Sequence, residues 1–265
     1  MPNREDVNVE RLDGGVALIR LARPELKNAI RLRTLEELGD AVAEATDDEG
    51  VRAIVIAGEG AHFCNGADLE FLAETRKLSP LMVQDRVYTK AQAAAKALYN
   101  CRKPTVAAVN GAAITLGCEL TLCCDFRVVS DTAFFQELWV KVGLIPPLGG
   151  MFLLPRLVGL GRAAELALRG RRVDAAEALA WGLANELVPG EAYLGRAVEL
   201  AQELAALPPQ GYRMVKLGLH RGMDSTMEHE LGTNSMTQPL LIASEDFAEG
   251  LASVKERRAP KFSGR

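Results

Sequence analysis

The chain has 265 residues, of which 48% are hydrophobic and 25% charged, and its formal net charge at pH 7 is −4. A chain of this length buries a substantial core, as one large domain or as one domain with a small appendage. The charge excludes a general attraction to nucleic acid or to an anionic membrane, so local positive groups must hold any anionic ligand. No apolar run is long enough to span a bilayer, and residues 1–15 lack the apolar stretch of a signal peptide. We therefore expect a cytoplasmic protein without nucleic-acid or membrane partners.

The five cysteines and three histidines do not form the pattern of a disulfide framework or a metal site. The cysteine number is odd, no two cysteines have Cys-x-x-Cys spacing, and the histidines are not paired at ligand spacing. We expect reduced, mostly buried thiols and no metal.

The first half of the chain alternates between strand and helix patterns. Residues 7–11 and 16–21 flank Asp13-Gly14-Gly15, which predicts a hairpin. Further on, continuous apolar runs predict strands covered on both faces, and apolar residues at helical spacing predict the helices between them. The other predicted strands are 53–57, 105–109, 126–129 and 133–135, and the predicted helical segments are 32–45, 67–73, 81–99 and the end of 111–124.

From about Leu148 onward only helical patterns occur, and Pro208-Pro209 separate the last long segments from what precedes them. Strand–helix alternation followed by a helical tail predicts an α/β core with an all-α C-terminal extension. We place the core and its site in residues 1–200 and the helical region in 201–265. The predicted helices are 149–157, 162–169, 174–181, 191–206, 209–221 and 227–256.

Two glycine-bearing loops, 58–69 and 110–119, each follow a buried strand and open a helix. A helix N-terminus presents unpaired N–H donors and the positive end of a dipole, so two facing termini would form an oxyanion hole. Glu119 follows Leu116 by three positions and lies on the same helical face, as a general acid or base beside a thioester carbonyl would. From the spacing alone, close packing of the glycines and a capping or solvated Glu119 are an equally open interpretation.

A series of short motifs runs in order along nearly the whole chain. They are 23–29 (RPELKNA), 62–69 (HFCNGADL), 108–113 (AVNGAA), 117–120 (GCEL), 124–125 (CD), 143–150 (GLIPPLGG) and 249–262, which ends in RRAPKF. The series resembles that of the crotonase (enoyl-CoA hydratase/isomerase) superfamily. The resemblance implies an α/β fold, a crotonase-like spiral of repeated ββα turns with an all-α C-terminal trimerisation region. It also implies an acyl-CoA substrate, no cofactor beyond the coenzyme A of that substrate, and a homotrimer or dimer of trimers.

The resemblance further assigns roles to individual residues. The backbone N–H groups of Ala67 and Leu116 would form the oxyanion hole, and Glu119 would be the first catalytic glutamate. Leu116 departs from the family's usual glycine; its N–H remains, but its side chain would reshape the pocket. Lys27 or Arg23 would be available to the phosphates of coenzyme A. The substrate-binding positions implied are Leu26, Lys27, Ala29, Asp68, Leu69, Gly117, Trp139 and Pro146.

The family's second catalytic glutamate falls on Trp139 in this chain. The nearest carboxylate, Glu137, lies two residues earlier, a displacement of roughly 6–7 Å along an extended segment, which is too far for an unchanged role. Family dehalogenases that resemble the chain in having this tryptophan also need an aspartate where Pro147 stands. The Δ3,Δ2-enoyl-CoA isomerases keep the second glutamate rather than the first. Neither dehalogenation nor isomerisation therefore fits the sequence better than hydration does.

Three hypotheses follow for the function. The first is a hydratase that adds water to, or removes it from, a 2-enoyl-CoA. The second is another reaction through an acyl-CoA enolate, such as isomerisation, decarboxylation or thioester hydrolysis. The third, motivated by Trp139, is an acyl-CoA-binding protein without catalysis.

Overall fold

The body of the protein is built on two sheets that the chain visits in turn. In the computed structural model, which describes residues 4–265, a six-stranded sheet has the order β1-β2-β3-β4-β6-β9 and a three-stranded sheet has the order β5-β7-β8. β1 pairs with β2, and β7 with β8, in antiparallel fashion, and the other pairs are parallel. The strands are β1 (Val7–Leu12), β2 (Val16–Leu21), β3 (Ala53–Gly58), β4 (Thr105–Val109), β5 (Ala112–Ile114), β6 (Phe126–Ser130), β7 (Phe134–Gln136), β8 (Val173–Asp174) and β9 (Glu186–Val188).

The chain winds between these sheets as a spiral, and each turn of the spiral consists of two strands and a helix. It leaves the large sheet after β4, adds β5 to the small sheet, returns through α5 (Leu116–Leu122) to β6, and then adds β7. Parallel pairing of β4 with β6 and of β5 with β7 requires such a crossover. This path brings the loop before α5 next to the loop that follows β3.

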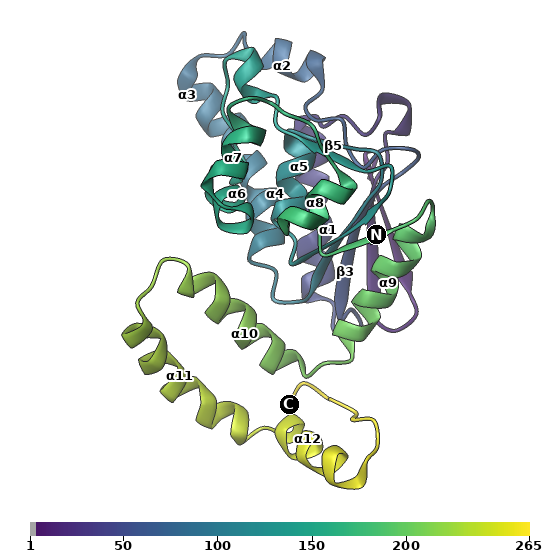
Figure 1. Ribbon diagram of the computed structural model, residues 1–265, viewed down its shortest axis with the longest axis vertical. Helices are drawn as coiled ribbons and strands as arrows, with labels where there is room; N and C mark the ends of the chain where they lie inside the picture. The colour runs from purple at the N-terminus through teal and green to yellow at the C-terminus, as the bar shows by residue number, and fades with distance from the viewer. Residues whose placement is uncertain (1–3) are drawn as a thin grey trace.

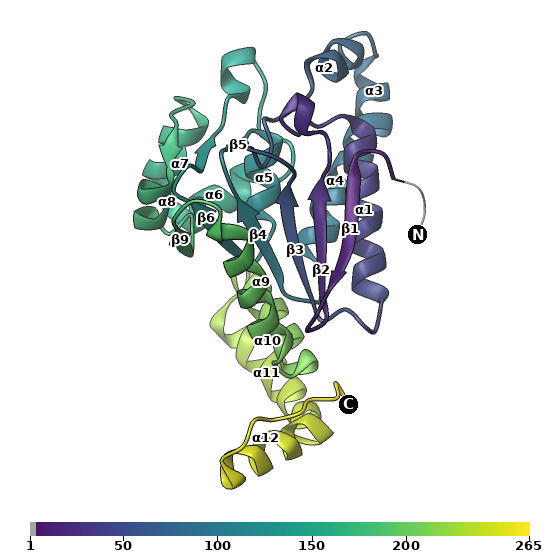
Figure 2. The same cartoon turned by 90° about the vertical axis from the view of Figure 1, so that its right-hand side faces the viewer.

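Helices cover both faces of the large sheet because its strands are apolar on both faces. Ala53, Val55 and Ala57 of β3 pack with α9 (Ala192–Ala205), whereas Ile54 and Ile56 belong to the core beneath α1 (Leu32–Asp47) and α4 (Thr89–Tyr99). Figure 2 shows α9 and α1 on opposite sides of the sheet. The remaining helices are η1 (Pro24–Leu26), α2 (Leu69–Thr75), α3 (Pro80–Met82), η2 (Val83–Tyr88), η3 (Trp139–Val142), α6 (Gly150–Val158), α7 (Leu160–Ala167), α8 (Ala175–Trp181), α10 (Pro209–Gly222), α11 (Met227–Ile242) and α12 (Glu245–Glu256).

The predicted order of strands and helices is confirmed, with three local differences. The predicted helix 81–99 contains the π-helical turn η2, and the predicted helix 227–256 divides after α11 because the Ser244 side chain caps α12, accepting a hydrogen bond from Phe247 N at 3.1 Å. β5, β8 and β9 were not predicted, since two or three residues carry too little periodicity to read, and β8 and β9 interrupt the region after Leu148 that was expected to be helical throughout. All five cysteines are buried and free, as expected.

The C-terminal helices α10, α11 and α12 extend away from the body (Figures 1 and 2). The boundary expected after residue 200 falls within α9, where Ala201 and Ala205 still pack on the sheet. Large apolar side chains stand exposed along the extended helices, so these faces lack a partner in the single chain. They include Val215, Leu219, Met227, Leu231, Met236, Leu240 and Val254.

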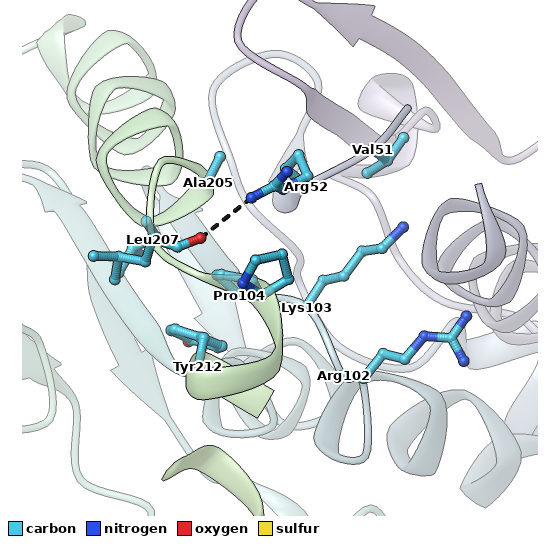
Figure 3. A pocket seen from close by; sticks show the side chains of 10 residues that line it. Val51, Arg52, Arg102, Lys103, Pro104, Ala205, Leu207 and Tyr212 are labelled. Carbon is cyan, nitrogen blue, oxygen red and sulfur yellow. Dashed lines mark hydrogen bonds between the residues drawn. The ribbon is translucent and has the colours of Figure 1, made fainter. Parts of the chain in front are cut away.

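A few polar bonds fasten α10 to the body. Lys216 Nζ lies 2.8 Å from Asp125 Oδ2, which also accepts a hydrogen bond from the Tyr212 hydroxyl at 3.1 Å. In the preceding turn, the Arg52 guanidinium donates to the Leu207 carbonyl oxygen at 3.2 Å (Figure 3). The cavity beside this bond, about 40 Å³, has room for roughly one water, and the Lys103 ammonium on its wall already donates to two backbone carbonyls. This cavity is a packing gap between the body and the turn that leads from α9 into α10.

No helix among residues 4–265 is long and apolar enough to cross a membrane.

Candidate active site

The two predicted loops meet because glycine lets their backbones touch. A Cβ added at Gly117 would lie 2.6 Å from the Cβ of Cys64, and one added at Gly66, where φ is +93°, would lie 2.2 Å from Thr115 Oγ1. Hydrogen bonds from Cys64 N to Ala112 O at 2.8 Å and from Ile114 N to Cys64 O at 2.9 Å lock the first loop onto β5. The spacing between the loops is therefore fixed by backbone contact.

The predicted oxyanion donors, Ala67 N and Leu116 N, donate to no acceptor within residues 4–265. Both residues line one cavity of about 700 Å³. Thr115, just before Leu116, has φ +47° and ψ −112°, a conformation that is costly for a β-branched residue. Its own N–H donates to Gln136 O at 2.9 Å, which holds the turn in place. Two free N–H donors beside one cavity can stabilise a negative charge on a bound oxygen.

Glu119 is completely buried and its carboxylate is surrounded by donors. Oε1 accepts a hydrogen bond from Trp139 Nε1 at 3.1 Å, and Oε2 accepts from Leu148 N at 2.6 Å and from Gly150 N at 3.0 Å. A Cβ at residue 150 would lie 3.2 Å from Oε2, so a side chain there would crowd the carboxylate. Burial raises the pKa of Glu119 to about 7, although the three hydrogen bonds favour its charged form. The group can therefore exchange a proton near neutral pH.

Trp139 connects this carboxylate to the cavity. The indole is 5% exposed, lines the same cavity as Ala67 and Leu116, and turns its N–H to Glu119. The sequence predicted a bulky wall here or altered chemistry, and the hydrogen bond to Glu119 adds an orienting contact that spacing could not reveal.

Glu137 lies apart from the cavity lining and is also completely buried. Among the described residues, neither of its carboxyl oxygens accepts a hydrogen bond. Burial and then the charge of Glu119 raise the pKa of Glu137 well above its usual value. The two buried carboxyl groups therefore oppose each other's ionisation.

The residues expected on the coenzyme A side lie away from this cavity. Lys27 is exposed at the left-handed end of η1, next to the exposed Leu26, and Ala29 is half-buried. Arg23, by contrast, donates to Ala29 O at 2.7 Å and to Asp68 Oδ2 at 3.0 Å. Arg23 is therefore engaged within the fold, and Lys27 is the more exposed of the two cations.

The other expected binding residues divide between structural and wall positions. Asp68 pairs with Arg23 and caps α2 by accepting a hydrogen bond from Glu70 N at 2.9 Å. Leu69 is exposed at the start of α2, and Gly117 provides the contact with the first loop. Pro146 lines a neighbouring cavity next to Pro147, a residue that borders both spaces.

Sequence reasoning missed two groups of residues. The N–H groups of Leu148 and Gly150 hold Glu119, and only the Gly149-Gly150 pair hinted at a close approach there. The side chains of Phe71, Leu72 and Val83 also line the cavity, and the sequence singled out none of them.

Comparisons with known proteins agree over the full length of the chain. Residues 11–265 match the family model described as enoyl-CoA hydratase/isomerase. The chain is 32% identical to a crotonyl-CoA hydratase of Syntrophomonas wolfei, covering 93% of this chain and 94% of that protein. It is 35% identical to an enoyl-CoA hydratase of Alternaria alternata, covering 95% and 86%. The crystal structure of an enoyl-CoA hydratase from Bacillus anthracis superposes with a TM-score of 0.92 at 30% identity, covering 98% of this chain and 100% of that one.

We predict that Gly117→Ala lowers the free energy of unfolding by about 1–3 kcal/mol, because its Cβ would collide with Cys64 and push the two loops apart. Urea denaturation would measure the change. The matched control is Gly195→Ala in α9, where an added Cβ meets nothing within 4 Å; it should raise stability by about 0.5–1 kcal/mol. Equal effects of the two substitutions would contradict the tight contact.

Proposed function

The chain belongs to the enoyl-CoA hydratase/isomerase family, and from this membership we propose that it adds water to, or removes it from, the 2,3-double bond of an acyl-CoA. The expected fold class, a crotonase-type α/β body with a helical C-terminal region, is confirmed. The proposal concerns what the site does with its particular residues.

The observation that carries the proposal is the position of Glu119 on the helix that Leu116 begins. A thioester oxygen bound by the N–H groups of Ala67 and Leu116 would leave the reacting carbons near the wall formed by Trp139. Behind that wall, the Glu119 carboxylate has a pKa of about 7. An oxyanion hole beside a titratable carboxylate suits addition alpha and beta to a carbonyl.

In the proposed reaction Glu119 takes a proton from water while the water oxygen bonds to the beta carbon. The electron pair of the double bond moves to the thioester, and the resulting enolate oxygen is held by the N–H groups of Ala67 and Leu116. Glu119 then returns the proton to the alpha carbon, so that one molecule of water is added in total. Glu119 has to serve both steps because Trp139 occupies the second glutamate's place, and Trp139 keeps the carboxylate oriented through its N–H.

A second candidate function is acyl-CoA binding without turnover. Glu119 has no exposed surface and each of its oxygens already accepts a hydrogen bond, so water reaches it only if neighbouring groups move. Products from a panel of unsaturated, malonyl-type and aromatic acyl-CoAs would separate hydration, other enolate reactions and simple binding.

We further propose that the reaction uses no cofactor beyond the coenzyme A of its substrate, and that Lys27 contacts the coenzyme A phosphates. A cytoplasmic location remains a prediction.

The first test of the mechanism is Glu119→Gln. We expect kcat for crotonyl-CoA hydration to fall by roughly 10²–10⁴-fold, because the amide cannot accept the proton of water, while acyl-CoA still binds. Stopped-flow loss of the enoyl absorbance measures the rate. The control is Glu137→Gln, which replaces a buried carboxyl outside the cavity lining by an amide of the same shape and should change kcat by less than about fivefold. An active Glu119→Gln enzyme would refute the mechanism.

The second test is the pH profile. Because the reaction needs ionised Glu119, kcat/KM should rise with pH and level off above about 7. The Trp139 N–H favours the charged form, so Trp139→Phe should raise the pKa further and move the rising limb to higher pH by roughly 0.5–1 unit. Trp181→Phe, at the other tryptophan, should leave the limb in place. A limb that moves to lower pH in Trp139→Phe would contradict the proposed hydrogen bond.

We also propose a homotrimer or dimer of trimers, because the exposed apolar faces of α10, α11 and α12 need a partner. Sedimentation at micromolar concentration should give three or six times the 28.6 kDa chain mass. Leu240→Lys, at a side chain 75% exposed on α11, should weaken assembly, whereas Leu160→Lys, 78% exposed on α7, should not. A wild-type monomer would contradict this assembly.

A further inference from the structure

The cavity beside the oxyanion N–H groups is far larger than a four-carbon acyl group requires. Its volume is about 700 Å³, within the range of pockets that enclose drug-sized ligands. At about 30 Å³ for each water-sized group, it corresponds to roughly 20 such groups. None of Leu26, Lys27 and Ala29, the positions expected near coenzyme A, contributes to its lining. The space therefore lies on the acyl side of the thioester.

Apolar side chains dominate the walls of this cavity. They come from α1, α2, η2 and the segment after η3, with Leu35, Phe71, Leu72, Val83, Val87 and Ile145 among them. Apart from Trp139, the polar residues of the lining are Thr75, Arg76, Gln84 and the half-buried Tyr88. The Thr75 hydroxyl is bonded to Phe71 O within its own helix, and Gln84 and Arg76 are exposed. Arg76 sits at the C-cap of α2, where the helix dipole already favours a cation.

The cavity lining also includes exposed apolar surface, from which a bound ligand would displace water. Val142 is 65% exposed and Ile145 is 62% exposed, both on the segment that follows Trp139. On the opposite wall, the π-helical turn η2 contributes Val83 and Val87. Such turns are frequent at functional sites, because the extra residue changes which side chains face a neighbour. At Ala91 of α4 the wall carries only a methyl group.

We propose that the preferred substrates carry an uncharged acyl chain of at least about eight carbons, which extends from the oxyanion N–H groups between α2, η2 and the segment 142–147. The proposal rests on the acyl-CoA function above and specifies its substrate class. Chain length is recognised by burial of apolar surface, so affinity increases with each methylene until the cavity is full.

Binding of saturated acyl-CoAs tests the cavity without requiring catalysis. Titration calorimetry with butanoyl-, hexanoyl-, octanoyl- and decanoyl-CoA should show affinity rising by up to about fourfold per added methylene. Octanoyl-CoA should bind at least tenfold more tightly than butanoyl-CoA. Equal affinities for the two would overturn the proposal. So would tighter binding of adipyl-CoA than of hexanoyl-CoA, because that would identify Arg76 as the partner of a distal carboxylate.

Replacing either of two alanines on α4 by leucine provides the variant and its matched control. Ala91→Leu extends the buried wall into the cavity and should lower the octanoyl-to-butanoyl affinity ratio at least fivefold. Ala93→Leu, on the exposed face of the same helix, should leave the ratio within twofold of wild type. Val83→Phe on η2 narrows the same space and substitutes for Ala91→Leu if thermal unfolding shows that variant to be misfolded. An unchanged ratio in a folded wall variant would overturn the proposal.

The outcomes separate this inference from the proposed reaction. Affinity that rises with chain length without hydration of any 2-enoyl-CoA would refute the hydratase and retain the long-chain site. Hydration of crotonyl-CoA with affinity independent of chain length would retain the hydratase and refute the long-chain site.

Discussion

The contact between two glycine-bearing turns is the constraint on which the site depends. Gly66 and Gly117 leave no Cβ between the loop after β3 and the start of α5, so Cys64 and Thr115 pack directly against the opposite backbone. Both turns end in an N–H without an acceptor among the described residues, and both N–H groups belong to residues that line one cavity. Backbone donors held by backbone contact lose little freedom when a ligand binds, which is why they stabilise developing charge effectively. The strained Thr115 is consistent with this, since the surrounding contacts over-determine its conformation.

Glu119 combines a structural role with a chemical one. Its carboxylate accepts two N–H groups at the start of α6 and the indole N–H of Trp139, so it connects three segments that meet at the cavity. The same burial that makes these bonds strong raises its pKa to about 7. A fully solvated glutamate would be ionised at neutral pH and a poor proton donor, whereas this one can both accept and return a proton. The cost is limited access, because the carboxylate is completely buried and does not line the cavity.

The body and the C-terminal helices depend on different kinds of interaction. The large sheet buries apolar side chains on both faces and is complete within one chain. α10 is fastened to it by a small polar cluster around Asp125 and Lys216, and all three C-terminal helices leave large apolar side chains exposed in the single chain. These exposed faces are the basis of the proposed homotrimer or dimer of trimers.

The sequence by itself determined most of the elements and the place of the two loops. Apolar runs such as 53–57 and 105–109 identified the central strands, and the two glycine loops predicted a site beside Glu119, because glycine and a helix start are local properties of the chain. The choice of Ala67 and Leu116 as oxyanion donors came from the resemblance to the crotonase superfamily. Only the tertiary structure decided what surrounds those groups. It engaged Arg23 with Asp68, placed the N–H groups of Leu148 and Gly150 on Glu119, turned the Trp139 indole toward the same carboxylate, and left the Glu137 carboxyl without a described partner. These partners lie up to 45 positions apart in the chain, as Arg23 and Asp68 do, and no local periodicity encodes which of them meet. The protonation of Glu119 and its access to water follow from these tertiary contacts, so they depend on packing rather than on composition.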